Sequence, residues 1–184
     1  METTDQPFQA PPRAPWWQII LIGRNPRVTA IRLLVTVAIA FAVFRWVLLP
    51  IRVTGISMAP TYRDGQKAYV NRLSLWLHPP QRGDILGIST SGIHTMFLKR
   101  VIALPGEQVR IMRGHVLING ELLEEPYLVN PAPWNWPADG HEEVMGPDEY
   151  LMIGDNRTMR VDEHEFGAAH RSKLVGRVLG KGAK

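Results

Sequence analysis

Hydrophobic and polar positions divide the chain into three parts. Residues 1–28 are polar and rich in proline, which is typical of a mobile tail. Residues 29–50 are almost continuously apolar, with arginines only near the two ends (Arg32 and Arg45), and about 20 such residues are enough to cross a bilayer. Residues 51–184 alternate short apolar runs with turn signals. The pattern predicts an N-terminal tail, one transmembrane helix and a separate domain.

The third part has the period-two alternation of β-strands. Within 108–122 the apolar residues alternate with polar ones, and Arg113-Gly114 and Asn119-Gly120 are typical turn pairs. Helical periodicity is weak, and residues 126–140, with several prolines, predict a surface loop. The expected fold is therefore mostly β, with an antiparallel sheet. Further strands are expected at 85–89, 96–104, 150–153 and 174–179, and a short helix near 71–77.

Composition and charge exclude several classes of function. The chain has no cysteine, which excludes disulfides, thiol catalysis and cysteine zinc sites. The net charge is only +4 and the lysines and arginines are scattered along the chain, so the sequence does not favour a nucleic-acid-binding protein. The histidines are dispersed and His164 and His170 lack the i, i+4 spacing of a zinc site, so we predict no metal and no cofactor. Basic residues on the two sides of the apolar segment are balanced, so charge does not predict its orientation.

Ser57 and Lys99 are the candidates for catalysis. Ser57 lies in GISMAPT, shortly after the apolar segment, and a serine hydroxyl needs a general base to act as a nucleophile. Lys99 is the lysine set in an apolar, strand-like run. A neutral lysine can act as a base, although its reference pKa of about 10.4 must first fall by several units through desolvation or charge repulsion. The alternative is a lysine that simply extends into solvent from the edge of a sheet.

Four motifs follow one another along the chain, namely G-x-S-M-x-P-T at 55–61, R-G-D-I at 82–85, K-R-V-I-A-L-P-G-E at 99–107, and G-D-N-R at 154–157 followed by D-x-x-x-F-G at 162–167. In this order and spacing they resemble the motifs of type I signal peptidases, and the resemblance covers Val53 to Gly180. The shorter pieces ING-E-L and E-P-Y-L within 118–128 are also similar. The resemblance implies a signal-peptidase-like antiparallel β-sheet domain anchored by one N-terminal transmembrane helix.

The resemblance implies a membrane-bound serine endopeptidase that removes signal peptides from exported preproteins after small residues (A-x-A sites). Ser57 matches the nucleophile and Lys99 the general base, and the backbone of Ser57 and Gly55 is expected to form the oxyanion hole. The implied location is the cell membrane, in contact with lipid, with residues 51–184 on the extracytoplasmic side. The residues expected to line apolar substrate pockets are Val53, Met58, Phe97 and Leu98.

Several residues of the motifs have implied supporting roles. Asp155 is expected to form a structural ion pair with Arg100, the residue after the base. Asn156 and Arg157 complete the same G-D-N-R motif. These roles are assigned by the position of each residue in the family's motifs. They are structural roles that hold the site together, and the residues take no part in the chemical reaction.

Two positions depart from the family's pattern. Arg160 stands where the family has a serine that orients the lysine, and an arginine cannot accept a hydrogen bond from it. His164 stands where an arginine usually pairs with Asp162, so that interaction is expected to depend on pH. These departures leave two alternatives open, a non-catalytic relative that keeps the peptide groove and a protease restricted to a few pilus or secretion clients. A soluble self-cleaving repressor with a Ser-Lys pair is disfavoured by the apolar segment and by the absence of a DNA-binding motif.

Overall fold

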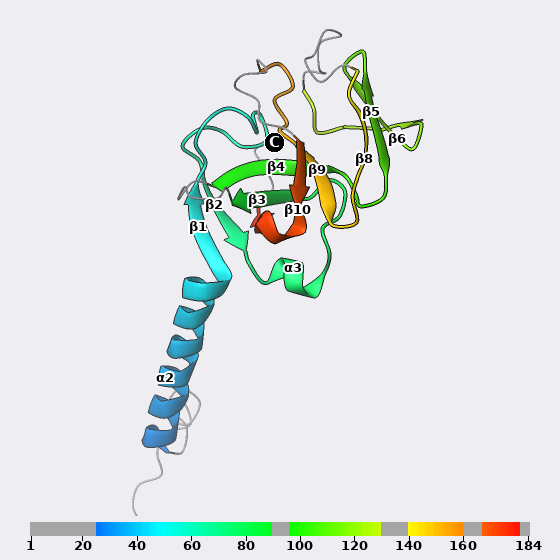
Figure 1. Ribbon diagram of the computed structural model, residues 1–184. Helices are drawn as coiled ribbons and strands as arrows, with labels where there is room; N and C mark the ends of the chain where they lie inside the picture. The colour runs from blue at the N-terminus through cyan, green and yellow to red at the C-terminus, as the bar shows by residue number, and fades with distance from the viewer. Residues whose placement is uncertain (1–24, 90–95, 130–139, 160–166, 181–184) are drawn as a thin grey trace, which may run out of the picture. The chain divides into compact units, whose positions relative to one another are not determined.

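The computed structural model of the protein describes residues 25–89, 96–129, 140–159 and 167–180 (Figure 1). The chain divides into two compact units, Met1–Val43 and Phe44–Lys184. The first contains a single described helix and the second contains all of the described strands. The predicted predominance of antiparallel β-structure is confirmed.

The helix α2 (Pro26–Ala42) begins at a well-defined cap and continues into a π-helical segment (Val43–Val47). Asn25 is the N-cap, and its side-chain oxygen accepts a hydrogen bond from the Arg27 N–H at 3.2 Å. Together the two segments form an apolar helix of 22 residues, Pro26–Val47, with a mean hydropathy of 2.0 in its most apolar window and no residue of that window buried. Its length and composition suffice to cross a bilayer.

The boundaries of this helix differ by three residues at each end from the predicted segment 29–50. The N-terminal end lies earlier because Asn25 and Pro26 form a favourable helix start. The C-terminal end lies earlier because the apolar residues that follow Val47 form strand β1 (Leu48–Arg52) and pair with β2. Pro50 is tolerated there because β1 lies at the edge of its sheet.

The larger sheet has seven strands in the order β1-β2-β11-β3-β4-β9-β10, and every neighbouring pair is antiparallel. A one-turn helix, α3 (Ser74–Leu77), follows β2, and a 3-10 turn (Arg171–Lys173) precedes β11. The remaining strands are β2 (Lys67–Asn71), β3 (Ile85–Ser89), β4 (Met96–Ala103), β9 (Glu149–Ile153), β10 (Gly167–His170) and β11 (Leu174–Leu179).

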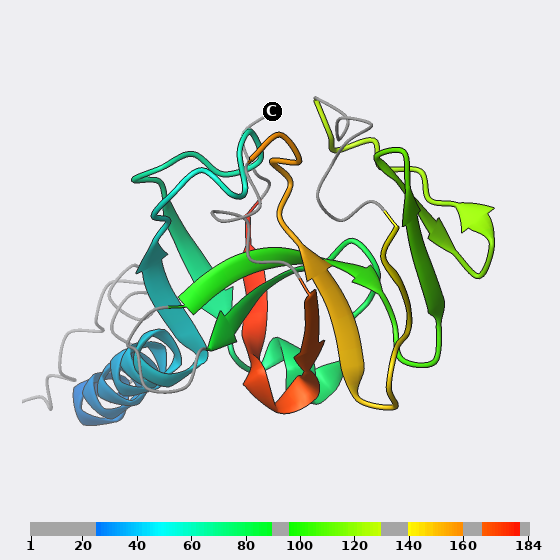
Figure 2. The same cartoon turned by 45° about the horizontal axis from the view of Figure 1, so that its top comes forward.

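The smaller sheet has four antiparallel strands in the order β7-β6-β5-β8, and it stands beside the larger one (Figure 2). Its strands are β5 (Gln108–Met112), β6 (His115–Ile118), β7 (Glu121–Leu122) and β8 (Glu142–Val144). The predicted turns are confirmed, since Arg113 and Asn119 have φ of 52° and 53° and each is followed by a glycine with positive φ.

Strands β4 and β9 are buried on both faces, because three apolar clusters meet along them. Leu98 packs in a cluster with Val53 and Met58, Val101 and Met152 in a second, and Ile102 in a third that includes the smaller sheet. As a result, all residues of β4 from Leu98 to Ala103 are buried. The two basic residues of this stretch therefore lie inside the domain.

Candidate active site

Ser57 lies in a loop of residues 53–66 between β1 and β2. The ends of this loop are held together, because the Val53 N–H donates to the Gln66 carbonyl and the Gly65 N–H donates to the Val53 carbonyl, each at 2.8 Å. Ser57 itself is half-buried. The loop is therefore a closed and well-anchored carrier for the serine.

The residue after the serine fixes the loop in the core. Met58 is only 1% exposed and packs with Tyr62 and Leu98. The Met58 carbonyl also accepts a hydrogen bond from the Tyr62 N–H at 2.9 Å. With its neighbour buried in this way, Ser57 has little freedom to reorient.

Lys99 lies in β4 and is 4% exposed. Its register partner on β3 is Leu86, which is fully buried, and Val101 lies two residues further along the same face. An apolar environment disfavours the charged form of a lysine. The sequence alternative of a lysine that extends from the edge of a sheet does not match this position, since β4 has neighbours on both sides.

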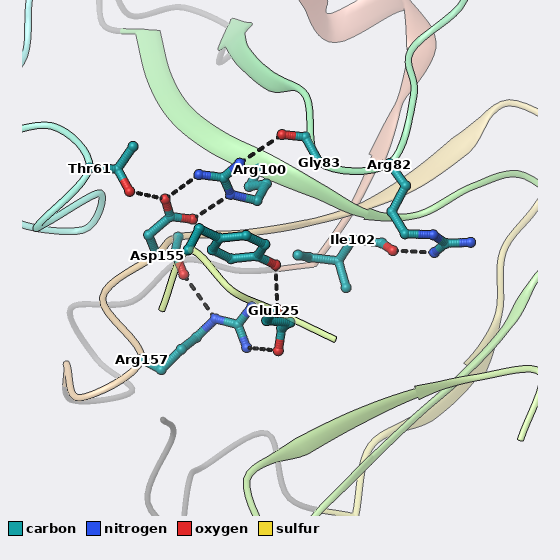
Figure 3. Close-up of polar contacts among 10 residues, drawn as sticks. Thr61, Arg82, Gly83, Arg100, Ile102, Glu125, Asp155 and Arg157 are labelled. Carbon is teal, nitrogen blue, oxygen red and sulfur yellow. Dashed lines mark hydrogen bonds and ion pairs between the residues drawn. The ribbon is translucent and has the colours of Figure 1, made fainter. Parts of the chain in front are cut away.

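Asp155 joins the strand of Lys99 to the loop of Ser57 (Figure 3). Arg100, next to Lys99, binds Asp155 through two hydrogen bonds, Nε to Oδ1 at 2.8 Å and Nη2 to Oδ2 at 2.6 Å. The Thr61 hydroxyl, from the serine loop, donates to the same carboxylate. The predicted Arg100–Asp155 pair is thus present, and Asp155 also contacts the loop of Ser57 through Thr61.

The next residue, Asn156, binds the backbone of the serine loop directly. Its backbone N–H donates to the Ser57 carbonyl at 3.0 Å, and its side-chain amide donates to the Ile56 carbonyl at 3.1 Å. Asp155 therefore binds both the strand of Lys99 and the loop of Ser57, and Asn156 adds two further bonds to that loop. This short segment after β9 thus connects the loop of Ser57 to the strand of Lys99, and the placing of Ser57 and Lys99 in one catalytic site stays a prediction.

Arg157, the last residue of the motif, is held by the segment that follows β7. The Glu125 carboxylate accepts hydrogen bonds from both terminal nitrogens of Arg157, whose Nε donates to the Gly154 carbonyl at 3.0 Å. The Tyr127 hydroxyl donates to Glu125 at 2.5 Å, and the Tyr127 ring lies 3.8 Å from the Arg100 guanidinium carbon. The G-D-N-R turn is therefore fixed from two sides.

Burial and neighbouring charges shift the pKa values of Arg100 and Tyr127 in this network. Burial alone would lower the pKa of Arg100, but its hydrogen bonds to Asp155 and the charge of that carboxylate raise it above the usual value. Burial, the neighbouring Glu125 charge and the hydrogen bond to Glu125 raise the pKa of Tyr127 far above its usual value. Near neutral pH, Arg100 is therefore a cation and Tyr127 a neutral hydrogen-bond donor.

A groove of about 600 Å³ opens at Ser57 and is lined by β1 with the residues after it and by the start of β4. All four predicted pocket residues, namely Val53, Met58, Phe97 and Leu98, line it together with Ser57. Within the described residues β1 pairs with β2 alone, so its outer edge is available to a further strand. The groove can accept an extended peptide whose backbone passes Ser57.

The N–H of Gly55, predicted for the oxyanion hole, already has a hydrogen-bond partner. Gly55 has a φ of 90°, which favours glycine, and its N–H donates to the Asp64 carboxylate at 2.8 Å. Gly55 is also absent from the lining of the groove. The Gly55 contribution to an oxyanion hole stays a prediction, and the bond to Asp64 counts against it, because an oxyanion would have to compete with a carboxylate for the same donor.

The R-G-D-I motif forms hydrogen bonds to strand β4 and to the residues just after it. Arg82 Nη1 donates to the Ile102 carbonyl at 2.5 Å (Figure 3). Arg82 Nη2 donates to the Glu107 carboxylate at 2.5 Å, and the two bonds fix the end of β4. The Gly83 carbonyl accepts a hydrogen bond from Arg100 Nη1 at 2.8 Å. These motifs hold the strand that carries Lys99.

Sequence reasoning missed Thr61, Glu125 and Tyr127 as members of the site. The motifs G-x-S-M-x-P-T and E-P-Y-L contain all three, so their presence in these motifs was the available signal. Two predicted residues, Arg160 and Asp162, lie outside the described residues, as does His164. Their assigned roles stay predictions.

Replacing Asp155 by asparagine is expected to destabilise the protein by about 3–5 kcal/mol, because it leaves Arg100 buried without its ionic partner. The measurement is the free energy of unfolding of the detergent-solubilised full chain in denaturant. The matched control is Glu142→Gln, which removes an exposed pair with Arg110 at 3.6 Å and is expected to cost at most about 1 kcal/mol. Equal losses for the two variants would contradict the structural role of Asp155.

Known proteins resemble this chain over most of its length. A protein-family model described as signal peptidase, peptidase S26, matches residues 27–180. A probable signal peptidase I-2 from Synechocystis sp. is 32% identical over 183 residues, which cover 96% of this chain and 77% of the relative. A signal peptidase I from Leptolyngbya laminosa is 37% identical over 131 residues, which cover 67% of this chain and 63% of the relative.

Among solved structures, a crystal structure of a signal peptidase I from Enterococcus faecalis aligns with 26% identity and a TM-score of 0.45. The alignment covers 54% of this chain and 97% of that chain.

Proposed function

Because this chain belongs to the peptidase S26 family of signal peptidases and is a serine endopeptidase, we propose that it removes N-terminal signal peptides from exported preproteins with Ser57 as nucleophile and Lys99 as general base. The observation that carries the assignment of residues is the segment of Asp155 and Asn156, which binds the strand of Lys99 and the loop of Ser57 at once. The proposed cleavage follows small residues of the A-x-A type.

In the proposed reaction, Ser57 Oγ attacks the scissile carbonyl while neutral Lys99 takes the proton of the Ser57 hydroxyl. The negative charge that develops on the carbonyl oxygen is stabilised by the Ser57 backbone N–H. The resulting lysine ammonium then gives its proton to the leaving amine, and the C–N bond breaks. A water molecule, deprotonated by Lys99, then attacks the acyl carbonyl; the ester bond to Ser57 breaks, the Lys99 ammonium returns a proton to Ser57 Oγ, and the signal peptide is released with a free carboxylate. The burial of Lys99 supports this role, because it favours the neutral base.

In the proposed complex, the substrate lies as an extended strand along β1 and enters the groove with small side chains. Backbone hydrogen bonds to an edge strand provide affinity, and pockets for alternate side chains provide selectivity. The lining residues Val53, Phe97 and Leu98 are apolar, which suits small apolar side chains beside Ser57. This arrangement supports a preference for alanine at alternate substrate positions.

We further propose that Pro26–Val47 spans the cell membrane once and that residues 51–184 lie on the extracytoplasmic side. The apolar helix supports the span, and the extracytoplasmic side is carried over from the resemblance to signal peptidases. The cleavage site of a membrane-held signal peptide emerges close to the bilayer. A nucleophile that follows the end of the span by ten residues along the chain can meet it there.

The test is cleavage of a preprotein with an A-x-A site by the purified full chain in detergent, with the product's new N-terminus determined by mass spectrometry. We expect one cut after the second alanine. A preprotein in which that alanine is replaced by tryptophan is the matched control and should stay intact. Absence of cleavage between pH 6 and pH 10 would favour the non-catalytic alternative, and cleavage of only a few preproteins would favour the client-restricted one.

A further inference from the structure

The short helix α3 carries a group of exposed apolar side chains that the catalytic site does not use. Trp76 is 87% exposed, Leu77 65% and the preceding Leu73 44%. The neighbouring Ser74 and Leu75 are buried, so one face of the helix packs on the domain and the other is open. Such a group of large apolar side chains on a surface marks an interaction site. We call Leu73, Trp76 and Leu77 the apolar foot.

The apolar foot is held in a fixed position by hydrogen bonds. The Ser74 hydroxyl donates to the Asn71 carbonyl at 2.6 Å and accepts from the Arg177 N–H at 2.9 Å. Arg171 Nη2 donates to the Leu75 carbonyl at 2.9 Å. Because both β2 and β11 hold the helix in this way, Trp76 and Leu77 cannot turn into the core without breaking these bonds.

The apolar foot lies next to the point where the candidate span ends. The N–H of Arg72, the residue before the foot, donates to the carbonyl of Val47 at 2.9 Å, and Val47 is the last residue of the apolar helix Pro26–Val47. This contact lies within the domain and holds whatever angle the helix takes. If Val47 ends a membrane span, the foot is therefore near the bilayer surface.

The surroundings of the foot carry positive charge. Arg72 and Lys173 are exposed, and the half-buried Arg171 lines a shallow hollow beside Trp76. Acidic residues among the described ones on this side include Asp148, whose backbone carbonyl accepts a hydrogen bond from the Arg171 N–H at 2.8 Å, and Asp84, whose carboxylate pairs at 2.7 Å with Arg177. Basic residues near a membrane surface favour anionic lipid headgroups, and tryptophan favours the headgroup zone.

We propose that the apolar foot inserts into the headgroup zone of an anionic bilayer and forms a second membrane contact beside the span. The proposal rests on the proposed function for one premise only, that Pro26–Val47 crosses the membrane. Two attachment points, one covalent and one peripheral, fix the tilt of the domain and hence the height of the Ser57 groove above the bilayer. A partner protein would cover the same side chains, but the basic rim and the position next to Val47 favour lipid.

The absence of cysteine in the chain allows a direct test. Single variants Trp76→Cys and Leu77→Cys of the full chain are labelled with a nitroxide and reconstituted into phosphatidylcholine vesicles with phosphatidylglycerol. We expect both labels to collide more with oxygen than with a water-soluble nickel complex. Matched controls are Leu122→Cys and Val144→Cys, which are similarly exposed on the smaller sheet and should be accessible to the nickel complex.

A label at Phe44→Cys, inside the candidate span, separates two kinds of failure. If Phe44 is in lipid while positions 76 and 77 are as aqueous as the controls, the foot does not contact the bilayer and this inference is wrong. If Phe44 is also aqueous, the membrane anchor of the proposed function fails as well. Protection of position 76 only after a partner protein is added would likewise overturn the lipid contact.

Activity gives an independent measurement. Trp76→Asp is expected to slow the cleavage of a bilayer-inserted preprotein about fivefold, equivalent to roughly 1 kcal/mol, and to leave cleavage of a short soluble peptide unchanged. Leu122→Asp should affect neither substrate. Equal losses for the two substrates, or no loss for either, would contradict a role of the foot at the membrane.

Discussion

Ser57→Ala is expected to reduce the cleavage rate of a preprotein by at least about 10³-fold, because the variant has no hydroxyl to attack the scissile carbonyl. The stability of the protein should be nearly unchanged, since Ser57 is half-buried and the neighbouring Met58 provides the packing of the loop. The measurement is the initial rate of product formation at saturating enzyme, followed on gels or by mass spectrometry.

The control for this variant is Ser89→Ala, at an exposed position at the end of β3, which should retain full activity. Binding should also survive in Ser57→Ala, because the groove is lined mainly by other residues. A variant that still cleaves within tenfold of the wild-type rate would show that Ser57 is not the nucleophile.

Lys99→Met is expected to cause a loss of similar size, at least about 10³-fold, because methionine fills a comparable buried volume without a basic nitrogen. Lys99→Arg should be equally inactive, since an arginine side chain does not deprotonate in proteins and cannot accept the serine proton. The measurements are the preprotein cleavage rate from pH 6 to pH 10 and the thermal midpoint of each variant in detergent.

The thermal midpoint distinguishes a lost base from a lost fold. A Lys99→Met protein that is inactive and retains its midpoint within a few degrees supports the role of Lys99 as base. One that unfolds far earlier indicates a structural role for the buried amine. Recovery of the wild-type rate at high pH in Lys99→Met would exclude Lys99 as the base, because methionine cannot be titrated.

Much of the fold could be predicted because local periodicity determines strand positions. The expected strands at 85–89 and 174–179 match β3 and β11 to the residue, and the expected strand at 96–104 exceeds β4 by one residue. The hairpin turns at Arg113 and Asn119 were also predictable, since each precedes a glycine. These features depend on a few neighbouring residues, and the sequence contains all of them.

The connections within the site depend on contacts between distant residues, which periodicity cannot indicate. The bond from Thr61 to Asp155 spans 94 residues, and the contact from Asn156 to Ile56 spans 100. The hydrogen bond from the Gly55 N–H to the Asp64 carboxylate could not be predicted from the sequence either, because a carboxylate in a loop has many possible partners. Motif resemblance predicted the Arg100–Asp155 pair, but the link from this pair to the serine loop required the structure.

The separation of Asp155 and Asn156 from Ser57 along the chain also determines when the enzyme becomes complete. A growing chain that ends before residue 155 already contains Ser57, Lys99 and the strands of the smaller sheet. It lacks the segment that binds Arg100, Thr61 and the Ser57 carbonyl. Contacts of such long sequence separation form late, since a long loop must close first. A nascent chain that has not yet reached Asp155 thus carries Ser57 and Lys99 without the segment that holds their loop and strand together.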